Sequence, residues 1–260
     1  MKNLRWLLVF GLVLFLTEGL IAQKITTERP FNILRANTLP SGSLQIEVGM
    51  DTYKLDYSTG GEKSFREWPT SLVRFGVTDR LELRGNIAYL QTVTDNDNGE
   101  VKSDPEFQNP SFGLKFLLYS GEGLIPSVSI IETAYMPIIH TDESFANDLT
   151  FSASNNIGDY FFATANFTWR HRVTASDEAS YGLMLGANLV GDLSIFGEYK
   201  TDYYENDIDW VWRSYTGFGA LYAVTDRIQL DASYTLEVGD KPERNERSYL
   251  RIGASARLFR

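Results

Sequence analysis

Two histidines, His140 and His171, are the residues of this chain best suited to acid–base chemistry, because histidine is the usual general base of enzymes. Asp142 and Asp177 lie near them in the sequence and could orient an imidazole ring. Neither histidine stands in a recognisable catalytic motif, and Arg170 and Arg172, on either side of His171, would oppose protonation of its ring. The sequence therefore favours a protein without catalytic residues.

A metal site is the next chemistry to consider. Residues 95–100 read Asp-Asn-Asp-Asn-Gly-Glu and offer oxygen ligands at a spacing similar to that of a calcium-binding loop. The later bidentate glutamate is not in the register that such a loop requires, so we expect a solvated acidic loop. No phosphate-binding loop, zinc constellation or nucleophile elbow occurs. We expect neither a metal nor a cofactor.

Charged side chains instead recur at every second position of apolar stretches. Residues 228–238 read Ile-Gln-Leu-Asp-Ala-Ser-Tyr-Thr-Leu-Glu-Val, in which apolar and polar side chains alternate. A β-strand sends successive side chains to opposite faces, so such a strand has one apolar and one polar face. The same alternation occurs in residues 44–51, 81–89, 161–170, 181–189 and 250–258, whereas residues 211–223 alternate poorly. This pattern is typical of a transmembrane β-barrel with a hydrated interior.

The charged members of the polar faces are expected to point into the barrel lumen. They are Glu47, Asp51, Arg74, Glu82, Arg84, Lys115, Glu132, Arg170, Glu198, Lys200, Asp231, Glu237, Arg251 and Arg257. We expect these residues to pair with one another and fill a narrow lumen. The alternative is a selectivity lining for polar solutes, although the presence of both signs does not predict strong ion selectivity.

Turn signals give the number of strands. Near copies of Val-Thr-Asp-Arg at 77–80 and 224–227, shorter relatives at 157–159 and 190–192, and Gly-Glu-Gly at 121–123 predict tight turns. They alternate with longer polar segments at 55–66, 93–108, 139–146, 172–179, 204–209 and 239–247. This alternation predicts an all-β fold, a single antiparallel barrel of about twelve strands, with short turns and both termini in the periplasm. A soluble β-sandwich is the alternative, but strands of about ten residues are longer than those of soluble sheets.

The N-terminus predicts export. Lys2 and Arg5 precede an apolar stretch at 7–16, and Ala22 provides a cleavage position, so residues 1–22 are expected to be a signal peptide. Residues 23–42 would then form a periplasmic N-terminal segment and residues 43–260 the barrel. Pro30 and Pro40 prevent this segment from being a regular internal strand. It could hang free or fold back into the barrel mouth as a plug.

The amino-acid composition indicates which classes of partner are expected. The formal net charge of -10 argues against nucleic-acid binding, which relies on clustered lysine and arginine. The absence of cysteine excludes disulfides, so stability must come from a closed hydrogen-bond network. The expected partners are outer-membrane lipid and lipopolysaccharide.

Two stretches resemble a known family. Residues 39–49, Leu-Pro-Ser-Gly-Ser-Leu-Gln-Ile-Glu-Val-Gly, with Glu28-Arg29-Pro30 before them, and residues 69–84, which contain Arg-Phe-Gly and Asp-Arg-Leu-Glu, resemble outer-membrane barrels grouped as phenol-degradation meta-pathway transporters. The resemblance implies a Gram-negative outer-membrane barrel that passes small, often hydrophobic or aromatic, compounds. At Glu28, Arg29 and Pro30 it favours the plugged state. Alternatives are a non-conducting structural or surface-binding barrel and an outer-membrane hydrolase.

The end of the chain departs from that family. Such barrels often finish on an outward-facing aromatic residue, whereas Phe259 is out of phase with Leu258 and is followed by Arg260. We expect Phe259 to serve as the terminal signal through which the barrel-assembly machinery recognises the C-terminal strand.

Overall fold

The computed structural model describes residues 25–56, 62–96, 99–173, 176–189, 192–205, 210–239 and 246–259. The predicted signal peptide, residues 1–22, lies outside the described residues. No helix in these ranges is long and apolar enough to cross a membrane.

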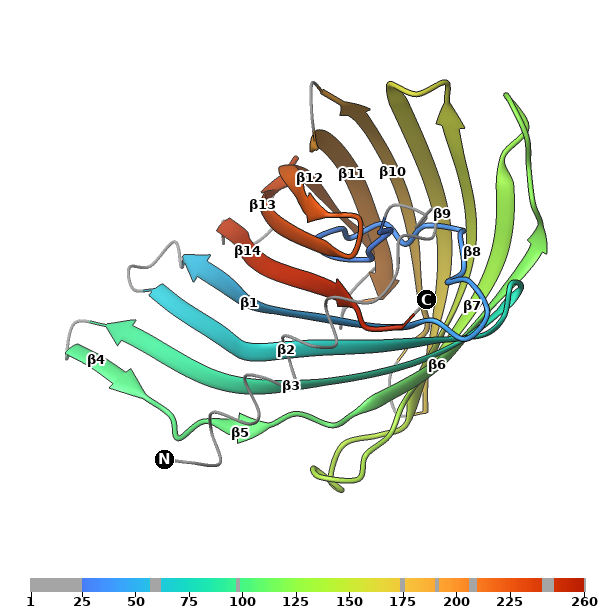
Figure 1. Cartoon of the computed structure of the whole chain (residues 1–260). Coiled ribbons are helices and arrows are strands. Elements are labelled where there is room, and N and C mark those ends of the chain that lie inside the picture. Colours follow the sequence, from blue (N-terminus) through green and yellow to red (C-terminus); the bar gives the residue numbers. More distant parts are fainter. Residues whose placement is uncertain are drawn as a thin grey trace, which may run out of the picture.

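The chain folds into antiparallel strands that close on themselves (Figure 1). In chain order they are β1 (Leu44–Asp56), β2 (Glu62–Thr78), β3 (Leu81–Asn96), β4 (Gly99–Lys102), β5 (Glu106–Phe107), β6 (Ser111–Tyr119), β7 (Ser127–Tyr135), β8 (Ala146–Ile157), β9 (Phe161–Arg172), β10 (Glu178–Asn188), β11 (Leu193–Glu205), β12 (Trp210–Thr225), β13 (Ile228–Val238) and β14 (Glu246–Arg257). Strand β1 pairs with both β2 and β14, and β2 also pairs with β3, which closes the ring. Strands β4, β5 and β6 all pair with β3 and together occupy one position in the wall, so the ring has 12 strands and the predicted antiparallel barrel of about twelve strands is confirmed.

Several strands extend into segments that the sequence pattern predicted as loops. Strands β4 and β5 are short pieces that pair with the distal half of β3, so residues 93–96, 99–102 and 106–107 are extended. Strands β1 and β2 likewise run into residues 55–66. These segments are polar on both faces, and polarity alone does not distinguish a solvated hairpin from a loop.

The barrel is apolar outside and polar inside. Large outward side chains such as Leu185 and Phe218 are 57% and 62% exposed, whereas inward positions such as Gln45, Ser129 and Thr164 are buried. This is the reverse of a soluble protein and is what a hydrocarbon surrounding requires of a β-barrel. The fold is a transmembrane β-barrel.

Strand β12 shows why residues 211–223 alternate poorly. Its inward positions include Gly217 and Gly219 rather than polar side chains. A Cβ atom at Gly219 would lie 2.5 Å from the ring of Phe196, and one at Gly217 would lie 3.0 Å from the Glu198 carboxylate. The side chains of Phe196 and Glu198 therefore occupy the space that a side chain at Gly219 or Gly217 of β12 would take.

The chain before β1 runs through the interior of the barrel, where Figure 1 shows it in dark blue within the ring of strands. We refer to residues 25–43 as the N-terminal segment. It begins at the short-turn end, where the Ile25 amide donates to the Asp226 carbonyl oxygen at 2.9 Å. It returns to the same end, where the Gly42 amide donates to the Gly76 carbonyl oxygen at 2.7 Å. The segment therefore enters and leaves the lumen by one mouth.

Candidate functional site

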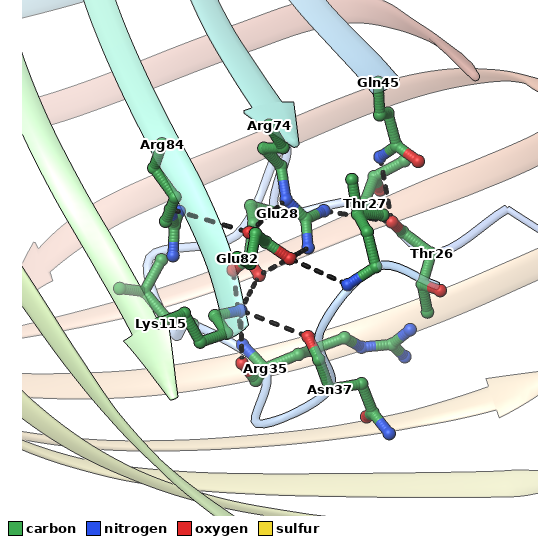
Figure 2. A network of polar contacts seen from close by, with 12 residues as sticks. Thr26, Thr27, Glu28, Arg35, Asn37, Gln45, Arg74, Glu82, Arg84 and Lys115 are labelled. Carbon is green, nitrogen blue, oxygen red and sulfur yellow. Dashed lines mark hydrogen bonds and ion pairs between the residues drawn. The ribbon is translucent and has the colours of Figure 1, made fainter. Parts of the chain in front are cut away.

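The N-terminal segment and the inner wall form the candidate site, and Glu28 lies in its densest polar network (Figure 2). Its carboxylate accepts a hydrogen bond from Lys115 of β6 and lies 3.4 Å from Nη2 of Arg74. Arg74 in turn lies 2.9 Å from Glu47 and 2.8 Å from Glu82. All five side chains are almost fully buried, so each charge depends on its partners for compensation.

The surroundings of Glu28 set its protonation. Burial alone raises the pKa of the Glu28 carboxyl, but the positive charges of Lys115, Arg84 and Arg74 outweigh burial and hold this pKa below its ordinary value. Glu28 is therefore ionised at neutral pH and contributes to docking as an anion.

Arg29 anchors the opposite side of the segment. Its Nη2 donates to Asp51 at 2.9 Å, and its Nη1 donates to the Thr70 hydroxyl at 2.7 Å. The wall makes room for this guanidinium with glycines, because a Cβ atom would lie 2.0 Å from Nη2 at Gly49 and 2.6 Å from Nε at Gly253. The glycines of β1 and β14 thus form the seat of Arg29.

Pro30 and Asn32 contact the middle of the wall. The carbonyl oxygen of Pro30 and the side-chain oxygen of Asn32 accept hydrogen bonds from Arg251, at 3.3 and 2.6 Å. The Asn32 amide donates to Glu198 at 2.9 Å. The Glu-Arg-Pro motif and the residues just after it therefore contact inward charges of β1, β11 and β14.

An apolar cluster lies beside this polar anchor. It consists of Phe31, Ile33, Phe162, Met184, Phe196 and Leu221, all buried. Phe31 packs edge-on against Phe196 with ring centroids 4.7 Å apart. Ile33 occupies the space above Gly182, where a Cβ atom would lie 2.0 Å from its Cδ1. Glycine at this position of β10 allows the segment to approach the wall closely.

The returning limb is held mainly through its backbone. The Ala36 amide donates to the Ser154 hydroxyl at 2.8 Å, and the Leu39 amide donates to Glu82 at 2.9 Å. Wall side chains thus replace the strand partners that an irregular backbone lacks.

The structure places almost all the predicted lumen residues on inward positions. These are Glu47, Asp51, Arg74, Glu82, Arg84, Lys115, Arg170, Glu198, Lys200, Asp231, Glu237, Arg251 and Arg257. The lumen residues nearest the N-terminal segment contact it directly, whereas others form ion pairs with neighbouring wall residues. Arg170 lies 2.5 Å from Asp148, Lys200 lies 2.9 Å from Asp202, and Glu237 lies 3.3 Å from Arg213.

The prediction that Glu132 faces the lumen is wrong. Glu132 pairs with Leu114 on one side and Leu149 on the other, both on the outward face, and it accepts a hydrogen bond from Asn147. Its neighbour Ile131 is the buried, inward residue. Two adjacent isoleucines in β7 hide the period-two phase, which the serines at 127 and 129 reveal.

The polarity pattern also missed several contributors to the lumen. Phe162 and Phe196 point inward although they are apolar, and the glycines paired with them, Gly186 and Gly219, are the sequence signal for this. Tyr53 also faces inward, where it stacks between Phe65 and Tyr249 at centroid distances of 5.2 and 4.7 Å.

Cavities remain around the segment. One of about 530 Å3 lies at the short-turn end, beside Arg35, Asn37 and Phe162. Another of about 360 Å3 lies between Tyr53, Phe65 and Tyr249, and one of about 160 Å3 lies where Asn32, Ile33 and Leu34 approach β8 to β11. The segment thus lines two of these cavities, whereas the aromatic cavity is lined by wall residues.

The histidines lie apart from this site. His171 Nδ1 lies 2.7 Å from Asp177, which also accepts from Trp169, and His140 Nε2 lies 2.7 Å from the Phe107 carbonyl oxygen. Among the described residues, no group of three or more His, Cys, Asp or Glu side chains could hold a metal ion.

Comparison with known proteins identifies the fold. No family model and no curated protein matches the sequence. Among solved structures, an outer membrane channel from Pseudomonas putida F1 matches at 12% identity over 85% of this chain and 97% of that one, with a TM-score of 0.66. The beta domain of the Bordetella autotransporter BrkA matches at 14% identity over 83% and 99%, with a TM-score of 0.59. The KdgM porin matches at 8% identity over 80% and 98%, with a TM-score of 0.50. The chain thus has the fold of the outer-membrane β-barrels.

Proposed function

We propose that this protein is an outer-membrane channel for small compounds and that the N-terminal segment is its plug. The observation that carries the proposal is the docking of residues 25–43 across the lumen by Glu28, Arg29 and Asn32. These contacts join the segment to β1, β6 and β11, so release of one segment would clear much of the interior. A closed barrel with a removable obstruction fits a gated channel.

The solutes we propose are small hydrophobic or aromatic molecules. The resemblance at residues 28–30, 39–49 and 69–84 supports this class, and so does the aromatic lining of the cavity at Tyr53, Phe65 and Tyr249. No cofactor is needed, because passive passage takes its energy from the solute gradient.

The outer surface of the barrel supports a location in the outer membrane. The apolar outward side chains contact membrane lipid, and lipopolysaccharide would surround the long-loop end. We further propose that residues 1–22 direct export into the envelope of a Gram-negative bacterium. Strand β14 with Phe259 would present the signal for the barrel-assembly machinery.

A non-conducting structural or surface-binding barrel is the second candidate. The observation that favours it is the buried ion-pair network around Arg74, since paired charges at this density leave little room for water. An outer-membrane hydrolase is the weaker alternative, because the His171–Asp177 pair is exposed and outside the lumen network.

Planar-bilayer conductance, with solute swelling of liposomes, tests the proposal. We expect the full chain to conduct weakly and a variant lacking residues 24–37 to conduct strongly, with both bands heat-modifiable on a gel. Absence of channel events in both folded proteins would favour the non-conducting barrel. Equal permeability of the two would show that the segment is only a tether.

A further inference from the structure

The cavity at the short-turn end has the lining of a binding site. It measures about 530 Å3 and lies between the N-terminal segment and the wall formed by β8 to β13. Its lining includes the amides Asn37, Asn156, Asn188 and Gln229 and the hydroxyls Ser154 and Thr164. Phe162 and Leu221 add apolar surface. Its volume lies in the range of about 300 to 1,000 Å3 that is typical of small-molecule sites, and its mainly polar lining suits a charged ligand.

Arg35 brings the cavity its cationic side chain from the N-terminal segment. Its backbone amide donates to Glu28 at 3.3 Å, but its guanidinium extends away from that network (Figure 2). The guanidinium carbon lies 4.5 Å from the ring centroid of Phe162 and 5.3 Å from that of Phe31. Aromatic faces thus hold the plane of the guanidinium, and its N–H edge remains available for an acceptor.

The positive charge of Arg35 is in excess. Within the polar network, the carboxylates Glu28, Glu47 and Glu82 are matched by the cations Arg74, Arg84 and Lys115. No carboxylate of the described residues lies within ion-pair distance of the Arg35 guanidinium.

The other acids of the cavity stand at its rim. Asp159 and Asp192 lie in the exposed turns after β8 and β10, where water and salt screen their charge. Burial lowers the pKa of Arg35 only to about 10, so the side chain is cationic at neutral pH.

We infer that this cavity binds a small organic carboxylate, with Arg35 as its charge partner. The carboxylate would accept the paired N–H groups of the guanidinium, the geometry for which arginine is suited. Amide groups of Asn188 and Gln229 would complete the polar contacts, while the body of the solute packs on Phe162 and Leu221. That this carboxylate is a solute carried by the channel rests on the proposed function, but its binding at Arg35 does not require the barrel to conduct.

Calorimetric titration of the folded full chain in detergent tests this inference. Benzoate, benzamide and benzylamine share a ring and differ in charge. We expect benzoate to bind about tenfold more tightly than benzamide, the gain of one charge-assisted hydrogen-bond pair, and benzylamine to bind least. Equal affinity for benzoate and benzamide in the unaltered chain would overturn the inference without any variant.

Variants locate the binding. Arg35→Gln should abolish the preference for benzoate, and Arg35→Lys should keep part of it because the charge remains. Arg80→Gln removes an exposed charge at the same end of the barrel, outside the cavity, and should leave benzoate binding unchanged. Undiminished benzoate binding in heat-modifiable Arg35→Gln protein would overturn the assignment. A barrel that binds benzoate through Arg35 but never conducts would refute the channel and keep the site.

Discussion

The guanidinium of Arg29 lies 2.9 Å from the carboxylate of Asp51, so a residue outside the strands is ion-paired with the inner wall of β1. The same guanidinium lies 3.8 Å from Asp231 of β13, whose carboxylate oxygens are buried and accept no hydrogen bond from the described residues. Arg29 therefore compensates the charges of two acids, and Asp51 has Arg251 as a second partner at 3.6 Å. Such a pair fixes position more than it adds stability, because loss of one partner leaves the other buried and unpaired.

Replacement of this anchor should open the channel. Arg29→Gln removes the charge and should weaken docking by roughly 1.5 to 3 kcal/mol, the value of a hydrogen bond to a charged group. The ratio of undocked to docked segment should then rise about tenfold or more, which single-channel open probability measures. Arg213→Gln breaks a lumen ion pair of 3.3 Å that does not involve the segment, and its open probability should stay at the wild-type level. A similar rise in both variants would speak against Arg29 as a specific anchor.

Acid should release the segment. The docked pKa of Glu28 lies below its ordinary value of 4.5, because Lys115, Arg84 and Arg74 together outweigh burial. The ionised Glu28 carboxylate therefore contributes fully to the free energy of docking above pH 4.5, and this contribution is lost as the pH falls through the lowered pKa. Conductance recorded from pH 7 downward should rise in the acid range, and Glu28→Gln should conduct more at neutral pH with a flatter profile. A profile as steep in Glu28→Gln as in the wild type would contradict this role.

Crowding at Gly182 should also loosen the segment. A side chain there meets Ile33, whose Cδ1 would lie 2.0 Å from the new Cβ atom. Gly182→Val should cost docking about 1 to 3 kcal/mol through overpacking. A second substitution tests this explanation. Ile33→Ala shortens the opposing side chain, so the double variant Gly182→Val with Ile33→Ala should again show low conductance. Conductance that stays high in the double variant would mean that the damage lies in β10 itself.

The outward position of Glu132 predicts a harmless substitution. Glu132→Leu places an apolar side chain between Leu114 and Leu149, so the free energy of unfolding in lipid vesicles should stay the same or rise, with unchanged conductance. Leu185→Arg is the contrasting case and should cost about 2 to 4 kcal/mol if it lies at the bilayer midplane. Urea titration compares them, and a large conductance change in folded Glu132→Leu protein would place this residue back in the lumen.

Much of the barrel could be predicted because period-two alternation is a local signal. In β13 and β14, inward charges such as Asp231 and Arg251 are flanked by outward apolar residues, so the phase there is unambiguous. In β7 and β12 the phase is hidden, because Ile130 and Ile131 are both apolar and because Gly217 and Gly219 give no polarity.

The partners of the N-terminal segment could not be read from the sequence. Prolines excluded a strand, but the contacts of Glu28 and Asn32 join residues 87 and 166 positions apart. Only the closed ring brings β6 and β11 to the same segment. The inward positions of Phe162 and Phe196 in the apolar cluster were likewise not predicted, since these side chains break the polarity rule by which the lumen was assigned.

A reversible cross-link between the N-terminal segment and the barrel wall tests most directly whether the segment closes the channel. The Ala36 amide lies 2.8 Å from the Ser154 hydroxyl, and the chain has no cysteine of its own, so Ala36→Cys with Ser154→Cys provides a single cross-linkable pair. Conductance is recorded in the oxidised protein and again after reduction, with each single variant as a control. If the segment is the plug, openings are absent in the oxidised double variant and return on reduction, while the single variants do not respond. Equal conductance of the oxidised and reduced double variant, with the cross-link verified, would contradict the plug role.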